Sequence, residues 1–275
     1  QAVAIACELP AQRGLPLSRF SLSEVVRVLE EEGVVLSIGR STVQRWFQER
    51  ALRPWRRRMW IFPRDPQFVQ RMVQVLDLYE RRFEGQPLKA DEYVLSADEK
   101  TSIQVLRRIH EPTAPYPGQV GRYEFEYRRH GVWAYLAGLD VQSGRVLGRV
   151  EDKTGKEPFM RLVDDVMRGE PYRDARRVFW IVDNGSSHHR NTFAERLRAR
   201  YPRAVAVHLP NHASWLNQIE IYFSILERKA LTPNDLSNRE AARERILGFE
   251  AHRNRVAKPF KWNFTRADLR QHLLS

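Results

Sequence analysis

Residues 178–188 decide the fold of this chain, and they read VFWIVDNGSSH. The run from Val178 to Val182 is apolar without interruption, which is typical of a parallel strand buried on both faces. Asp183 follows this strand directly. Because α/β folds bind ligands at the carboxyl ends of their parallel strands, Asp183 stands where a functional carboxylate is expected. The alternative is an ordinary turn acid in front of Asn184-Gly185.

The residues on both sides of this strand predict a sheet with helices on it. Further strands are expected at 93–105, 132–141, 145–150 and 204–209, and helices at 157–167 and 192–200. Residues 107–130 are basic and contain Pro and Gly, which indicates a loop or a hairpin insertion. Strands first, followed by alternating helices and strands, predict an α/β fold with a mixed sheet flanked by helices.

The N-terminal part predicts a pair of short helices. Ser21-Leu22-Ser23-Glu24 has the form of a capping box, and Gly33 ends the first helix. A second helix begins near Ser37, and its polar face is rich in residue types that contact DNA phosphates and bases: Arg40, Ser41, Thr42, Gln44, Arg45 and Gln48. The pair is typical of a helix-turn-helix, of winged-helix or homeodomain-like type. An ordinary helical hairpin with a solvated face is the alternative.

A basic segment with tryptophans follows the second helix. Four of its arginines are candidate phosphate contacts, because guanidinium groups pair with phosphate oxygens: Arg53, Arg56, Arg57 and Arg58. A solvated basic loop is the other interpretation. A helix is expected at about 65–82, and the turn-forming residues 84–88 end it. The predicted domains are therefore a helix-turn-helix domain at 1–62, a linker helix at 63–90 and a domain built on the mixed sheet at 91–275.

Composition limits the class of protein and its partners. The chain has 275 residues with 46 Lys and Arg against 34 Asp and Glu, a net charge of +12. A basic excess of this size favours a polyanionic partner, and nucleic acid is the usual one. Apolar runs are too short to span a membrane. The single cysteine excludes an intramolecular disulfide framework, so we expect a reducing, cytoplasmic location.

Two further carboxylates accompany Asp183. Asp98 lies within the long strand at 93–105, where a buried acid is costly unless it is paired or binds a metal. Glu220 lies early in a helix, at the edge of its apolar face. Taken singly, Asp98 can be an ion-pair partner and Glu220 a solvated helix residue. The spacings are 85 residues (183 − 98) and 37 residues (220 − 183).

Together these segments resemble a known family. Residues 209–220, LPNHASWLNQIE, resemble the segment that leads to the last acid in DDE transposases, most closely in the bacterial insertion-sequence branch of the mariner-like superfamily. Asp98-Glu99 and residues 182–188 resemble the other two motifs of that family. The helix pair followed by Leu52-Arg53-Pro54 resembles its DNA-binding region, so the resemblance covers nearly the whole chain.

The resemblance implies an RNase H-like catalytic domain in which Asp98, Asp183 and Glu220 hold two divalent cations. Magnesium is the expected ion, and manganese is a common substitute. Asp98 is expected to bridge the two ions, with Asp183 and Glu220 completing one ion each. Three accessory residues are expected to orient a phosphate or flank the metals, or else to be structural polar groups: His188, His212 and Asn217.

The implied function is that of a transposase. It would bind the terminal inverted repeats of a transposon in double-stranded DNA, cut there and join the ends to target DNA, as a homodimer or larger synaptic assembly near the bacterial nucleoid. Two alternatives are a catalytically idle, transposase-derived regulator and a nuclease for RNA–DNA hybrids. Family members carry a further helical segment upstream, and residues 1–20 are expected to be its remnant and the linker after it.

Overall fold

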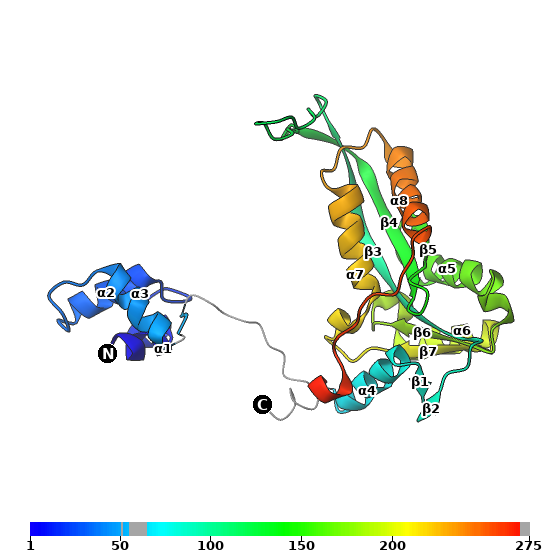
Figure 1. Ribbon diagram of the computed structural model, residues 1–275, viewed down its shortest axis with the longest axis horizontal. Helices are drawn as coiled ribbons and strands as arrows, with labels where there is room; N and C mark the ends of the chain where they lie inside the picture. Colours follow the sequence, from blue (N-terminus) through cyan, green and yellow to red (C-terminus); the bar gives the residue numbers. More distant parts are fainter. Residues whose placement is uncertain (51, 55–64, 270–275) are drawn as a thin grey trace. The chain divides into compact units, whose positions relative to one another are not determined.

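The computed structural model describes residues 1–50, 52–54 and 65–269 (Figure 1). The chain divides into two compact units, Gln1–Phe62 and Pro63–Ser275. Arg56, Arg57 and Arg58, three of the predicted DNA contacts, lie outside the described residues. Within the described residues, no helix is both long and apolar enough to cross a membrane.

The first unit is helical. It contains α1 (Ala2–Cys7), a 3-10 turn, α2 (Leu22–Glu31) and α3 (Arg40–Glu49). The expected capping box begins α2: Glu24 N donates to Ser21 Oγ, and Ser21 N donates to the Glu24 carboxylate at 2.6 Å. Side chains from all three α-helices share one apolar core, which includes Ile5, Phe20, Val25, Leu29, Val43 and Phe47. Residues 1–20 are thus part of this core.

A five-stranded mixed sheet forms the centre of the second unit. Its order is β5-β4-β3-β6-β7, with β3 (Glu92–Arg108), β4 (Tyr127–Asp140), β5 (Val146–Glu151), β6 (Arg177–Val182) and β7 (Ala204–His208). Strand β4 is antiparallel to both of its neighbours, whereas β6 is parallel to both of its own. A small separate hairpin pairs β1 (Arg82–Phe83) with β2 (Gln86–Pro87). The predicted mixed sheet flanked by helices is confirmed.

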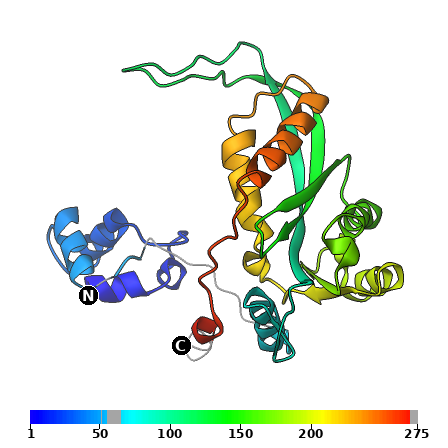
Figure 2. The same ribbon diagram turned by 45° about the vertical axis from the view of Figure 1, so that its right-hand side comes forward.

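Strands β3 and β4 continue as a ribbon that projects beyond the sheet (Figures 1 and 2). Their pairing extends to Arg108 opposite Tyr127, and two further bridges join the segment between them. The insertion at 107–130 is therefore a hairpin. We call residues 109–127 the hairpin arm. It exposes several large apolar side chains: Ile109, Tyr116, Val120, Tyr123, Phe125 and Tyr127.

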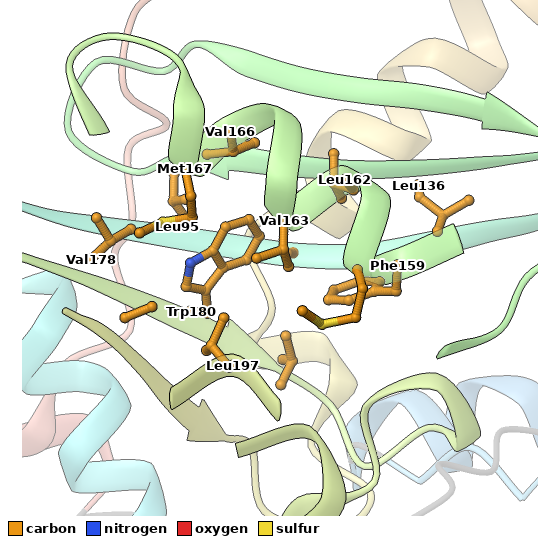
Figure 3. Close-up of a cluster of buried hydrophobic side chains, with 14 of the residues drawn as sticks. Leu95, Leu136, Phe159, Leu162, Val163, Val166, Met167, Val178, Trp180 and Leu197 are labelled. Atoms are coloured by element: carbon orange, nitrogen blue, oxygen red, sulfur yellow. The ribbon is translucent and has the colours of Figure 1, made fainter. Parts of the chain in front are cut away.

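Helices cover both faces of the sheet. On one face, α5 (Lys156–Arg168) and α6 (Arg190–Arg200) pack around Trp180, which is fully buried (Figure 3). The other face receives α4 (Phe68–Tyr79), α7 (Ile219–Leu226) and α8 (Arg239–Asn254). Trp180 faces the first group, while Phe179 and Ile181 face the second. Strand β6 is thus buried on both faces, as its apolar run predicts.

Helix α4 packs on the sheet. It lies in the segment 63–90, for which the sequence suggests a linker helix. Its side chains Met72, Val75 and Leu76 are buried against Phe179 and Ile181 of β6. The structure therefore groups this helix with the sheet that follows it in the chain.

One half-buried acid on α8, Glu250, gives this fold a pH-dependent stability. Tyr135 donates a hydrogen bond to Glu250 Oε2 at 2.6 Å. Burial raises the pKa of Glu250 to about 7, from an ordinary value of 4.5. An acid whose pKa is raised on folding stabilises the fold fully below its unfolded pKa, and this contribution is lost as the pH rises through the folded pKa.

Glu250→Gln is expected to remove this pH dependence, because the amide oxygen still accepts from Tyr135 but does not titrate. Between pH 4.5 and pH 8, the wild type should lose roughly 1–3 kcal/mol of unfolding free energy relative to the variant. Urea unfolding of both proteins at the two pH values measures the difference. Parallel pH profiles would contradict the assignment.

Candidate active site

Two aspartates meet where β3 and β6 stop pairing. The parallel register of the two strands ends with Ser96 opposite Ile181. Asp98 lies two residues further along β3, on the same face as Ser96, and Asp183 is the first residue after β6. The carboxyl edge of the sheet therefore brings together two acids that are 85 positions apart in the sequence (183 − 98).

Asp98 is a buried carboxylate with two defined hydrogen bonds. Only 8% of the residue is exposed. Its Oδ1 accepts from Glu99 N at 2.8 Å, and its Oδ2 accepts from Asn217 Nδ2 at 3.1 Å. Burial, followed by the negative charge of Asp183, raises the pKa of Asp98 to about 7. A positive charge close to Asp98 and Asp183 would stabilise the ionised form of both carboxylates.

A tight turn orders Asp183. Its Oδ1 accepts from Gly185 N at 2.6 Å and lies 2.9 Å from His188 Nδ1. Burial works against ionisation, but the hydrogen bonds from His188 and Gly185 lower the pKa of Asp183 below its usual value. A Cβ at position 185 would lie 2.9 Å from Asp183 Oδ1, so any larger residue there would displace this carboxylate. Gly185 is consequently part of how this turn holds the carboxylate of Asp183.

His188 is the predicted accessory residue that lies closest to the acids. It is only 1% exposed, and its ring packs against Phe159 with centroids 4.7 Å apart. Within the described residues, Asp98, Asp183 and His188 each offer one ligand atom such that all three atoms lie within 4.8 Å of one another. Glu220 is not in that group. The structure thus places a histidine beside the two aspartates.

Glu220 lies in the first turn of α7 and is half-buried. Burial raises its pKa, the charge of Lys100 lowers it, and the charge of Asp183 raises it again. The charge of Glu220 in turn raises the pKa of Asp98. The third predicted acid therefore interacts electrostatically with both aspartates, but it lies outside the group that they form with His188.

Asn217 fixes the start of α7 to β3. It is fully buried, and its Nδ2 donates to Ala97 O and to Asp98 Oδ2, both at 3.1 Å. Ser96 Oγ donates to Asn217 Oδ1 and accepts from Ile219 N at 3.0 Å. Asn217 is therefore a positioning residue for Asp98. It meets its hydrogen-bonding capacity within the protein.

Sequence reasoning missed two polar residues that bind the segment 216–219 at the start of α7. One is Ser96, described above. The other is Tyr79 of α4, whose hydroxyl donates to Leu216 O at 2.8 Å and accepts from Gln218 N at 3.4 Å. A serine two residues before Asp98 on a buried strand is a signal that could have found Ser96. The helical pattern of α4 gives no comparable signal for Tyr79.

The other predicted contacts are distributed differently. His212 is exposed and adopts a positive φ of 61°. It is not part of the group formed by Asp98, Asp183 and His188. On α3 the predicted polar face is solvent-accessible: Arg40, Ser41, Gln44, Arg45 and Gln48 are exposed and Thr42 is half-buried, and Arg53 beyond the helix is also exposed. These side chains are available to a partner of the first unit.

Comparison with known families now identifies the second unit. Residues 94–243 match the family of DDE superfamily endonucleases, and this region contains most of β3 and all three predicted acids. The chain belongs to the DDE superfamily of endonucleases. This DDE endonuclease has no significant match among curated proteins.

Solved structures share its fold at low sequence identity. A pre-cleavage Mos1 transpososome has a TM-score of 0.53 and 14% identity, over 90% of this chain and 71% of that one. A Mos1 transposase paired-end complex with the left transposon end has a TM-score of 0.51 and 14% identity, over 86% and 72%. The mixed five-stranded sheet with helices on both faces is therefore the RNase H-like fold that the family resemblance implies.

The acids of this DDE endonuclease fit a divalent cation. Hard cations such as Mg²⁺ prefer carboxylate oxygens and keep water or phosphate in the remaining positions. Asp98 and Asp183 supply such oxygens at close range, and His188 is the only basic side chain that pairs with the buried Asp98 among the residues that the structure describes. A buried, closely spaced acid pair of this kind is costly without a counter-charge, and a bound cation supplies one.

Asn217→Ala tests the positioning role. Removing the amide leaves Ala97 O and Ser96 Oγ short of a buried partner, so we expect a loss of roughly 1–3 kcal/mol in unfolding free energy. Ser96 and Asn217 share a hydrogen bond, so the double variant with Ser96→Ala should lose clearly less unfolding free energy than the sum of the two single losses. Urea unfolding measures all three. Ser214→Ala, exposed in the same loop, is the control and should change little.

Proposed function

We propose that this chain is a metal-dependent DNA transposase in which Asp98, Asp183 and Glu220 are the catalytic carboxylates. The convergence of Asp98 and Asp183 at the carboxyl edge of the sheet carries the proposal. It is supported by membership in the DDE endonuclease superfamily and by the exposed polar face of α3 in the first unit. The motifs at 98–99, 182–188 and 209–220 favour the bacterial insertion-sequence branch of the mariner-like superfamily.

Two Mg²⁺ ions, or Mn²⁺ in their place, are the proposed cofactors. Asp98 would bridge them, with Asp183 and Glu220 each completing one. When bound, such a pair supplies an activated water or 3′-hydroxyl and stabilises the leaving oxygen of an in-line displacement. The protein's own part is to hold the carboxylates. Asn217 and Glu99 N fix Asp98, Gly185 N fixes Asp183, and α7 presents Glu220.

Double-stranded DNA is the proposed partner. Five exposed polar residues of α3 would contact it together with Arg53 and with Arg56, Arg57 and Arg58, in a protein whose net charge is +12. The solved Mos1 complexes include paired transposon ends and a strand-transfer complex. By extension, we propose that this chain cuts at terminal repeats and joins the ends to a target within the bacterial cytoplasm.

An idle regulator derived from a transposase is the second candidate, since the helical unit alone would bind DNA. The intact set of three acids favours the enzyme. A nuclease for RNA–DNA hybrids shares the fold, but hybrids are recognised by shape and backbone, and they give no role to the polar face of α3. A panel of duplex DNA, hybrid and RNA substrates separates these functions.

Asp98→Asn is expected to abolish magnesium-dependent cleavage of DNA that carries the terminal repeats, because the amide cannot bridge two cations. DNA binding in a mobility-shift assay should stay within about twofold of the wild type, since the α3 face belongs to the other unit. Asp165→Asn, an exposed acid on α5, is the control and should cut normally. Cleavage by the Asp98 variant would remove the assignment.

The hairpin arm supports the proposed homodimer or larger synaptic assembly. Val120 is 80% exposed and Phe125 is 90% exposed. Apolar side chains gathered on a projecting hairpin are stabilised when another surface covers them. Since two transposon ends must be handled together, a second copy of this chain is the proposed partner of the arm.

Val120→Ser together with Phe125→Ser should weaken assembly on paired-end DNA by about tenfold or more, because two buried apolar side chains are worth a few kcal/mol. Light scattering over a concentration series measures the dissociation constant. Val256→Ser changes an apolar residue that is 64% exposed outside the arm, so it should leave assembly unchanged. An equal effect of both variants would argue against the arm as the interface.

A further inference from the structure

The imidazole of His188 has one nitrogen engaged and one without a partner. Its Nδ1 lies 2.9 Å from Asp183 Oδ1 and 3.2 Å from Asp183 O. Its Nε2 is buried and makes no hydrogen bond. A buried polar atom without a partner is uncommon in folded proteins, and one explanation is a ligand or ion that completes the site. The residue is only 1% exposed, so bulk solvent does not supply the missing partner.

The engaged nitrogen fixes the tautomer. Both atoms next to Nδ1 are oxygens of Asp183, and each can only accept a hydrogen bond. The proton of a neutral imidazole therefore lies on Nδ1, and Nε2 carries a lone pair. This matches the arrangement common to metal-binding histidines, in which one ring nitrogen donates to a carboxylate while the other binds the ion.

The distance between Nε2 and Asp98 suits a shared cation. Nε2 lies 4.0 Å from Asp98 Oδ1, which is too long for a hydrogen bond. Nitrogen and oxygen ligands of a first-row divalent ion each lie about 2.0–2.2 Å from it. Two donors that are 4.0 Å apart can therefore bind the same ion from opposite sides with little movement.

We propose that His188 Nε2 is a direct ligand of one catalytic cation, together with Asp98, and that Asp183 orients the ring through Nδ1. This inference rests on the proposed metal-dependent function and adds a nitrogen to its three carboxylates. Phe159 and Phe193 pack against the ring, with centroids 4.7 and 6.2 Å away, and so hold its plane. Carboxylates suit Mg²⁺, whereas imidazole favours transition metals, so this site should bind Mn²⁺ more tightly than Mg²⁺.

Pulsed electron paramagnetic resonance of Mn²⁺ bound to the full chain tests the ligand directly. A nitrogen bound to the ion gives a nuclear modulation that changes when the histidines are labelled with ¹⁵N. The labelled wild type needs no substitution, so the result does not depend on whether a variant folds. His188→Phe, which keeps a ring between Phe159 and Phe193, assigns the signal, and His189→Phe at the exposed neighbour is the matched control.

We expect the wild type and His189→Phe to show the histidine modulation and His188→Phe to lack it, with Mn²⁺ affinity weakened by about tenfold or more in His188→Phe alone. A second outcome is that Mn²⁺ binds the wild type and is lost in Asp98→Asn, but the wild type shows no nitrogen modulation. This result would overturn the histidine ligand and leave the proposed metal site intact. Mn²⁺ binding that does not depend on Asp98 would overturn the proposed metal site itself.

Discussion

The parallel pairing of β3 with β6 is the constraint on which the rest of the site depends. It places two carboxylates from distant parts of the sequence side by side at one edge of the sheet. Their mutual repulsion and the burial of Asp98 oppose folding, because a desolvated charge next to a like charge is costly. Three surrounding groups offset this cost: the amide of Glu99 and the side chain of Asn217 donate to Asp98, and the ring of His188 donates to Asp183.

These groups come from segments that the sheet alone would not hold in place. Asn217 connects β3 to the start of α7, and Ser96 caps the same connection by accepting from Ile219 N. Asn217 precedes Glu220 by less than one helical turn. The hydrogen bonds that position Asp98 therefore also fix the start of α7, which carries Glu220. A short, buried hydrogen-bond network therefore fixes the position of Glu220 relative to Asp98, although Glu220 is the more exposed of the two.

The sequence predicts the sheet well because its signals are local. The apolar run at 178–182 identifies a buried strand, and the polar residue that follows identifies its functional end. The parts that escaped prediction depend on contacts between distant segments. Nothing local shows that Asn217 is satisfied by β3, that Tyr79 reaches Leu216, or that His188 faces Asp98. Sequence alone likewise did not assign α4 to the sheet, because an amphipathic helix does not specify its partner surface.

The packing of α4 has a consequence for where the catalytic unit begins. A fragment that starts at residue 91 would lose α4, which leaves Phe179 and Ile181 of β6 without their cover on that face. It would also remove the Tyr79 hydroxyl from Leu216 O and Gln218 N, the residues on either side of Asn217. The apolar loss weakens the central strand, and the polar loss loosens the segment that fixes Asp98. A smallest active catalytic fragment must therefore include α4, so its beginning lies before Phe68.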